Sequence, residues 1–358
     1  MDILKSSALN LNGGTLGTSA DSMTIDVTSG RTALSVVLGT ETTSTINTGK
    51  YDTSTKTFTD TGAAISIANV ISGDGALKKA GAGMLTLSNA NTYKGGTVIE
   101  AGTVVAANAN ALGTTKGVEV QSGATLNLGA SAVTVAGLSG AGTVGLADGT
   151  TSSTLTVNSD TDSTFSGSIG GEAGAAISLV KQGAGTLELS GDNIMLVYPP
   201  IVGFAPGVDV QAGTVRVVQT GSNNQVFANV SVADDATLEL STVSESIAVN
   251  ATSVVLSSSA KILVDMSNYA SDADVVAVNL ISASALSYAG TTINAGNVDT
   301  LLGAIELKNW GDGWTQSLSY ANNTLSLTLT IPEPSVFGLL AGLGALALAG
   351  TRRRRRKA

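Results

Sequence analysis

The chain has 358 residues and contains neither cysteine nor histidine, so disulfides, zinc–thiolate sites and histidine catalysis are excluded. Six of its 18 lysines and arginines lie in the last seven residues, which leaves the rest with 12 basic against 27 acidic residues, a net charge of 12 − 27 = −15. Such an acidic body argues against nucleic-acid binding, which needs a basic surface. The 43 glycines, with many Thr, Ser, Asn and Ala around short aliphatic runs, are typical of short strands joined by tight turns.

The first residues lack the features of a secretory signal. Met1–Lys5 carries an acidic residue at its second position, and no apolar stretch precedes Asn10. Residues 1–65 contain irregular strand-like segments such as Met23–Val27 and Ala33–Leu38. We interpret this part as a truncated N-terminal β region whose true start lies upstream. The alternative is insertion directed by the C-terminal tail, which would have to move an arginine cluster across a membrane.

A short phrase recurs through residues 66–265. It consists of two small residues, a threonine and an alternating aliphatic strand, as in Ala101–Ala106 and Ala212–Val217. With the threonine as marker, copies fall at positions 84 (Met in place of Thr), 103, 125, 143, 164, 186, 214 and 237, an average spacing of 153/7, about 22 residues. Strands that alternate in polarity and recur at this spacing predict an all-β fold, a right-handed parallel β-helix (β-solenoid) with coils about 4.8 Å apart. A pair of β-sandwiches is the alternative.

Two longer segments share a more detailed pattern. Leu77–Thr97 contains Lys-x-Gly-x-Gly-x-Leu-x-Leu-Ser, then a polar turn with asparagine, an aromatic residue and Gly-x-Thr. Leu179–Asn193 repeats the first part and departs from the pattern after Asn193. This pattern resembles the autotransporter-associated β-strand repeat. The resemblance implies a β-solenoid displayed outside the cell.

The phrase disappears after Lys261–Asp265, and we expect residues 266–330 to form a C-terminal β cap. Strand-like segments lie at Val275–Leu280 and Leu318–Leu329. Repeat arrays need such atypical ends to cover their last coil. The main concentration of aromatic residues falls in this cap: Trp310, Trp314 and Tyr320. These side chains either seal the end of the solenoid or form a contact site for a glycan or a partner protein.

The tail has three parts. Pro332-Glu333-Pro334 ends the preceding strand, because prolines close together fit neither strand nor helix interiors. An uncharged run from Val336 to Gly350 follows, and we expect it to form a single hydrophobic membrane helix, although it is shorter than the roughly 20 residues that span a bilayer comfortably. A basic cluster ends the chain: Arg352, Arg353, Arg354, Arg355, Arg356 and Lys357. This cluster predicts a cytoplasmic C-terminus with the body on the far side of the membrane.

The order of motif, helix and basic cluster in residues 331–358 resembles the PEP-CTERM protein-sorting signal. The resemblance implies an exosortase-type sorting enzyme as partner, transient insertion in the inner membrane, and cleavage near the motif. The protein would then reach the cell surface or the extracellular matrix. A simple membrane anchor without processing is the alternative.

No arrangement of residues indicates catalysis, and we expect no enzyme activity, cofactor or metal. Pairs of carboxylates occur at three places: Asp160 and Asp162, Asp234 and Asp235, and Asp272 and Asp274. We interpret them as solvated turn residues, with calcium binding as the alternative. The prediction is an exported structural or adhesin-like protein, with extracellular polysaccharide or other surface proteins as candidate partners. The alternative function is a surface polysaccharide-binding or polysaccharide-degrading β-helix protein.

Overall fold

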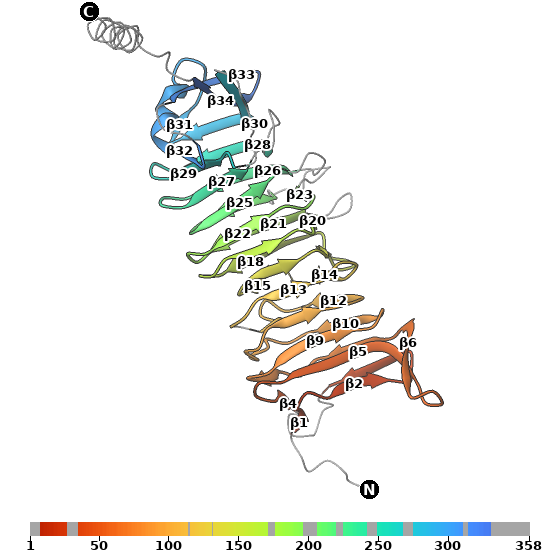
Figure 1. The fold of residues 1–358 in the computed structure, drawn as a ribbon. Helices are drawn as coiled ribbons and strands as arrows, with labels where there is room; N and C mark the ends of the chain where they lie inside the picture. The colour runs from red at the N-terminus through yellow and green to blue at the C-terminus, as the bar shows by residue number, and fades with distance from the viewer. Residues whose placement is uncertain are drawn as a thin grey trace, which may run out of the picture.

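The computed structural model describes residues 8–26, 35–113, 115–130, 132–170, 176–195, 206–219, 225–241, 249–267, 275–310 and 314–330. Within these ranges the chain is almost entirely β-strand, apart from one short 3-10 helix, η1 (Val298–Ala304). The strands stack into an elongated rod with the two ends of the chain at opposite ends (Figure 1). The expected all-β class is confirmed. The expected hydrophobic helix from Val336 to Gly350 lies outside the described residues.

Each coil contributes strands to up to three sides of the rod, and we name the resulting stacks ladders I, II and III. Ladder I consists of β2 (Thr15–Thr18), β5 (Thr43–Asp52), β9 (Ala76–Ala80), β11 (Thr97–Ile99), β13 (Val118–Val120), β16 (Leu138–Gly140), β19 (Ser163–Phe165), β22 (Thr186–Leu189), β25 (Thr214–Val218), β27 (Thr237–Ser241), β29 (Lys261–Asp265) and β32 (Ile305–Lys308). Ladder II consists of β3 (Ser22–Ile25), β7 (Ala64–Ile67), β10 (Met84–Leu87), β12 (Thr103–Ala106), β14 (Thr125–Leu128), β17 (Thr143–Leu146), β20 (Ser168–Gly170), β23 (Asn193–Met195) and the first halves of β26 (Gln225–Val232) and β28 (Val249–Leu256).

The third side of the rod is less continuous. At its N-terminal end it consists of β1 (Ala8–Leu11), β4 (Ser35–Leu38) and β8 (Ile71–Gly73). Further along, ladder III consists of β15 (Ala132–Val135), β18 (Ser152–Asn158), β21 (Ala176–Gln182), β24 (Gly207–Val210) and the second halves of β26 and β28. All of these pairs are parallel, as the sequence predicted for a β-solenoid. The right-handed sense of the coil remains a prediction.

The core is a set of aliphatic columns that run along the inside of the rod. Val104, Leu126 and Val144 occupy one register position in successive coils of ladder II, and all three are fully buried. The alternate positions of the same strands face outward, which is the pattern expected for strands with one buried face. Each buried aliphatic side chain contributes about 1.5–3 kcal/mol relative to an exposed one. The columns therefore stabilise the rod without disulfides.

The repeated threonines do not follow one ladder. Thr103, Thr125 and Thr143 pair in ladder II, whereas Thr186 and Thr214 pair in ladder I. Thr164 pairs with Glu188 and not with Thr186. The expectation that all copies keep one register is therefore wrong. Each copy marks a corner followed by a strand, and that corner changes sides between Thr143 and Thr186.

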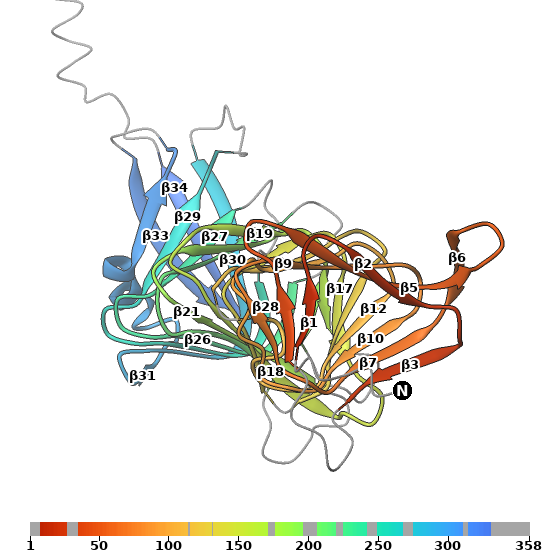
Figure 2. The same ribbon diagram turned by 90° about the horizontal axis from the view of Figure 1, so that it is seen from below.

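The N-terminal part already follows the parallel stack, because β2 and β3 pair with strands of the following coil. In addition, β5 continues into an antiparallel hairpin with β6 (Thr57–Gly62), which stands out from the body in Figure 2. The rings of Tyr51 and Phe58 lie 5.1 Å apart in this hairpin. The domain limits expected at residues 65 and 265 remain predictions.

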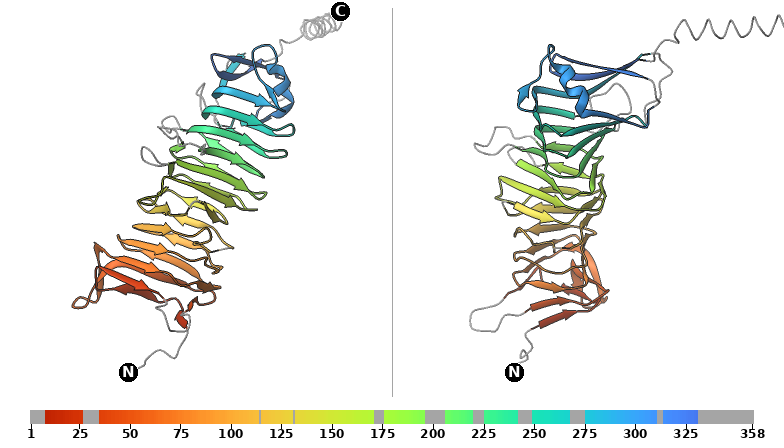
Figure 3. Two further views of the ribbon diagram at one scale, coloured as in Figure 1. Left: turned by 180° about the vertical axis from the view of Figure 1, so that it is seen from behind. Right: turned by 90° about the vertical axis from the view of Figure 1, so that its left-hand side faces the viewer.

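The C-terminal end changes from parallel to antiparallel pairing. β30 (Val275–Tyr288) pairs in parallel with β28, and antiparallel with β34 (Thr324–Thr330) and the short β31 (Thr291–Thr292). β33 (Thr315–Ala321) continues the antiparallel sheet, as Figure 3 shows. Strands occur where the sequence predicted them in the cap, and Leu318–Leu329 is divided into two by a turn at Asn322 and Asn323, both with positive φ. Leu325, Leu327 and Leu329 are fully buried, so the cap closes the core.

Candidate functional site

The expected aromatic residues lie together at the C-terminal end of the rod. The rings of Trp310 and Trp314 are 5.0 Å apart and tilted by 60°, and both side chains pack against the core while remaining partly exposed. Tyr320 lies on β33 and donates a hydrogen bond from its hydroxyl to the backbone oxygen of Ala283 at 2.6 Å. Burial raises the pKa of Tyr320. The three aromatic residues therefore contribute to closing the end, and the two tryptophans also present ring surface to solvent.

A row of charged side chains on the outer face of ladder I leads to the tryptophans. Glu188, Arg216 and Glu239 occupy one register position on β22, β25 and β27. Arg216 bridges Glu188 and Glu239, with nitrogen–oxygen distances of 3.5 Å in both cases, and it also contacts Asp265 on β29. Lys308 on β32 lies 3.0 Å from Glu239. The row thus ties together strands from several successive coils.

Asp265 connects this row to the aromatic pair. Its side chain is only 2% exposed, and its Oδ1 accepts hydrogen bonds from the amide of Asn309 at 2.8 Å and the backbone N–H of Ser267 at 2.9 Å. Burial alone would raise the pKa of Asp265, but these hydrogen bonds and the charge of Arg216 together lower it. Trp310 follows Asn309 directly in the chain. We name Arg216, Glu239, Asp265, Lys308, Trp310 and Trp314 the C-terminal patch.

The C-terminal patch offers ring faces beside paired charges, a combination suited to contact with a polar partner that also has an apolar face. Its acidic groups are already paired with Arg216 and Lys308. In the part of the chain that the structure describes, no cluster of three or more acidic side chains is arranged to hold a metal ion. The sequence indicated the aromatic part of the patch but not the charged row. The signal for that row was the charge alternation at residues 188, 216 and 239.

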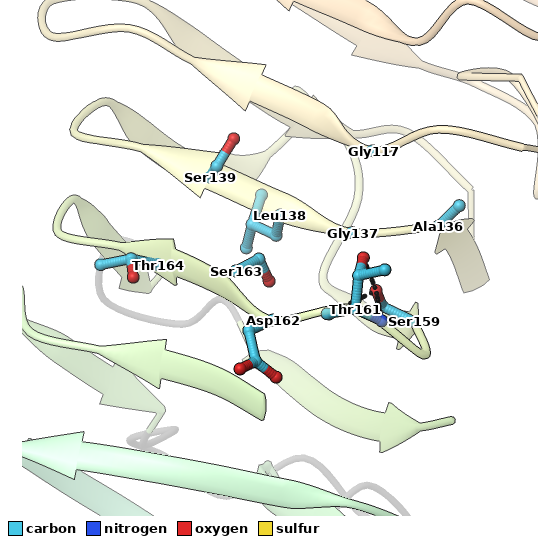
Figure 4. A pocket seen from close by; sticks show the side chains of 10 residues that line it. All are labelled: Gly117, Ala136, Gly137, Leu138, Ser139, Ser159, Thr161, Asp162, Ser163 and Thr164. Carbon is cyan, nitrogen blue, oxygen red and sulfur yellow. Dashed lines mark hydrogen bonds between the residues drawn. The ribbon is translucent and has the colours of Figure 1, made fainter. Parts of the chain in front are cut away.

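A shallow open groove of about 510 Å³ crosses the corner between ladders III and I (Figure 4). Its lining is polar and consists mostly of glycine, serine and threonine. Gly117 and Gly137 pack so closely that a Cβ on Gly117 would lie 2.8 Å from the backbone oxygen of Gly137. The hydroxyl of Ser159 donates to the backbone oxygen of Thr161 at 2.8 Å. The groove presents hydroxyl groups to solvent but lacks aromatic side chains among its lining residues.

The paired carboxylates connect neighbouring coils. Asp160 and Asp162 accept hydrogen bonds from the backbone N–H groups of Ala184 and Thr186, at 2.9 and 2.8 Å. Asp234 likewise accepts from the backbone N–H of Ser259 at 3.0 Å, which lowers its pKa. These exposed acids therefore fasten the turn of one coil to the backbone of another, a role more specific than the expected solvated turn. Asp272 and Asp274 lie outside the described residues.

The sorting signal also lies outside the described residues. This applies to Pro332-Glu333-Pro334, to the run from Val336 to Gly350 and to the basic cluster Arg352–Arg356. Among the residues that are described, no helix has both the length and the apolar character needed to cross a membrane. The sorting motif therefore remains a prediction from the sequence.

The comparisons with known proteins concern the repeats. Residues 77–106 and 179–217 match the Passenger-associated-transport-repeat family. The expected autotransporter-associated repeats are confirmed. The adhesin BmaC autotransporter of Brucella suis biovar 1 (strain 1330) is 35% identical over 136 residues, which cover 37% of this chain and 4% of the adhesin. The chain thus corresponds to a small part of that relative's length. No solved structure matches.

The two matched segments form the same corner on different sides of the rod. In the first, Lys79 precedes a corner from ladder I to ladder II, and in the second, Lys181 precedes a corner from ladder III to ladder I. Both lysines are fully buried. Their ammonium groups donate to the equivalent oxygens of Gly81 and Gly183 at 2.7 and 2.8 Å. The repeat therefore encodes a local corner and not a fixed position in the coil.

Proposed function

We propose that this protein is an exported, surface-displayed β-solenoid rod with a structural or adhesin-like function, and that it is not an enzyme. The observation that carries the proposal is the match of two segments to passenger-associated repeats within one continuous parallel stack. Similarity to part of an adhesin supports the adhesive role. A stack in which every coil hydrogen-bonds to the next suits a stiff spacer that holds a contact surface away from the membrane.

Surface display and adhesion are tested separately. Protease treatment and antibody labelling of intact cells should detect residues 8–330 outside the cell. Because the chain has no cysteine, a single cysteine introduced at Asn10 fixes it to beads through one end of the rod. Such beads should attach to cells or extracellular matrix several-fold more than beads coated with albumin. A protein inaccessible on intact cells, or beads that attach no better than albumin beads, would refute the proposal.

The finer part of the proposal concerns delivery. We propose that an exosortase-type enzyme recognises Pro332-Glu333-Pro334 while the run from Val336 to Gly350 is transiently in the inner membrane. Cleavage then releases the rod to the cell surface or extracellular matrix. The three-part order of the tail in the sequence supports this assignment. Intact-mass analysis of the surface fraction should give a chain that lacks Val336–Ala358, and Glu333→Ala should retain the tail. A mature protein that keeps the tail contradicts processing.

A second candidate function, polysaccharide binding, has its support in the C-terminal patch. Trp310 and Trp314 keep part of their ring surface exposed next to charged side chains. Stacking of sugar rings on aromatic faces is a common mode of glycan recognition. Trp314→Ala should then abolish binding on a glycan array with little change in melting temperature. A large loss of stability with unchanged glycan binding would instead assign Trp314 to closing the core.

A further inference from the structure

The first coil of the rod is paired on one side. β1 pairs with β4, β2 pairs with β5, and β3 pairs with β7. Within the described ranges none of these three strands has a second partner strand. They form the lower end of the rod in Figure 1. A row of unpaired strand edges is a template for pairing with another chain.

The hydrophobic core is open to solvent at the same end. Leu16 and Met23 are in register with Ile46 and Ile65 of the next coil. Ile46 and Ile65 are at most 1% exposed, whereas the first-coil members of these columns are only partly buried. The same holds for two further apolar side chains of the coil, Leu9 and Ile25. We name the edges of β1, β2 and β3 together with Leu9, Leu16, Met23 and Ile25 the N-terminal face.

The backbone of the N-terminal face is poised for strand pairing. The oxygens of Leu11, Gly14 and Asp21 accept hydrogen bonds from the next coil, each at 2.9 Å. Because successive residues of a strand direct their backbone groups to opposite edges, the groups of Asn10 and Thr15 point to the open side. An occupant of this face must therefore supply strand edges around an apolar centre.

We propose that the N-terminal face docks against the same face of a second copy of this chain. The opposite end cannot serve as the partner, because the antiparallel cap buries Leu325, Leu327 and Leu329. Residues 1–7 are fewer than the first coil needs, which runs from Ala8 to Ile25. A two-fold axis brings identical edges together in antiparallel pairs and joins the two apolar centres. Because both outer ends are capped, assembly stops at a dimer of about twice the rod length.

Light scattering after gel filtration of the full chain tests the assembly. The protein component should have a mass near 71 kDa, twice the 35.5 kDa of one chain. Leu16→Asp should return it to one chain, because the charge enters the apolar centre. Val255→Asp is the matched control, since Val255 is also an exposed apolar residue, 48% exposed, but lies away from the face on β28. A monomeric wild type, or a folded Leu16→Asp variant that stays dimeric, overturns the proposal.

If Leu16→Asp fails to fold, Thr15→Pro provides a second variant. It removes an N–H on the open edge at the first residue of β2, where proline is tolerated in a strand. The ladder hydrogen bond from Thr45 to Gly14 is not affected. Thr15→Pro should lower the apparent affinity of the dimer at least tenfold while keeping a native circular dichroism spectrum. Unchanged affinity overturns the proposal.

Spin labels on single introduced cysteines identify the surface that docks. A label at Asn10 should report a defined short distance between the two copies. A label at Asn322, on the cap, should report none, because stacking of the twelve described strands of ladder I at about 4.8 Å places the caps of the dimer roughly 100 Å apart. The reverse result would mean association through the tail and overturns the proposal. So does a monomer whose β1–β3 amides resist hydrogen exchange, since its own chain would then cover the face.

Discussion

The ammonium nitrogen of Lys79 lies 2.7 Å from the backbone oxygen of Ala101 in the next coil. It also donates to the oxygens of Ala80 and Gly81 on its own coil, at 3.1 and 2.7 Å. Lys181 makes the corresponding contacts with Gln182 and Gly183. A fully buried lysine thus serves three carbonyl groups that a tight corner would otherwise leave without donors.

Lys79→Met should destabilise the protein by about 1–3 kcal/mol, because it leaves buried carbonyl oxygens without their donor. The neighbouring residue provides the control. Lys78 forms an exposed ion pair with Glu100 at 2.6 Å, so Lys78→Met should cost less than about 1 kcal/mol. Urea denaturation of both variants measures the difference. Equal effects would show that the carbonyl contacts of Lys79 contribute nothing beyond a surface charge.

The buried lysine also predicts how stability depends on pH. Burial lowers the pKa of Lys79 to about 8 from its usual 10.5. Between these values the unfolded chain binds more protons than the folded chain, so the contribution of Lys79 to stability increases as the pH rises. From pH 8 to 9.5, wild type should gain on the order of 1–2 kcal/mol relative to Lys79→Met. Denaturation curves below pH 10, where tyrosines do not yet ionise, provide the measurement. A constant difference would contradict the assigned pKa.

Gly102 and Gly213 occupy the same place in the two repeat corners. Their φ values are 66° and 67°, and a Cβ on either would lie 2.4 Å from a backbone oxygen, that of Gly83 or Gly183. Gly102→Ala should therefore cost about 3–5 kcal/mol, from backbone strain plus a clash with main chain. Thermal unfolding and urea denaturation can quantify this loss.

Gly123 is the matched control for these glycines. It has a similar φ of 81°, but a Cβ there would meet nothing within 4 Å. Gly123→Ala should cost only the strain of the left-handed conformation, about 1–2 kcal/mol. If both alanine variants lose the same stability, close stacking of the corners is not what requires Gly102.

Local patterns were sufficient to predict most of the strands. The phrase at Thr103, Thr125 and Thr214 begins a strand in every case, because a glycine corner and alternating aliphatic residues act over only a few positions. The same patterns predicted parallel coils. They could not reveal which side of the rod a strand joins, since Lys79 and Lys181 begin the same corner on different sides.

Long-range contacts explain what the sequence did not reveal. The charged row depends on Arg216 meeting Asp265, 49 residues later in the chain. This contact exists only because strands two coils apart lie side by side, and the lengths of the intervening loops are not set by any local pattern. The aromatic residues at the cap were predictable from composition, whereas their proximity to the charged row was not.

Arg216 should contribute strongly to stability, because it is the cation closest to a carboxylate that is almost fully buried. Arg216→Ala leaves Asp265 with hydrogen bonds from Asn309 and Ser267 but without this charge. We expect a loss of about 3–5 kcal/mol at pH 7. Lys261→Ala is the control, since Lys261 and Glu306 form a pair whose side chains are 51% and 53% exposed, and it should cost less than about 1 kcal/mol.

The acid side of the pH profile tests the same contact. The pKa of Asp265 is lowered in the folded chain, so its stabilising contribution is present above the usual value of 3.8 and disappears as the pH falls through the folded-state value. Removing the Arg216 charge raises that pKa. The acid unfolding midpoint of Arg216→Ala should therefore move to higher pH, whereas that of Lys261→Ala should change little. Fluorescence of Trp310 and Trp314, next to the row, follows the transition, and an equal shift in both variants would contradict the role assigned to Arg216.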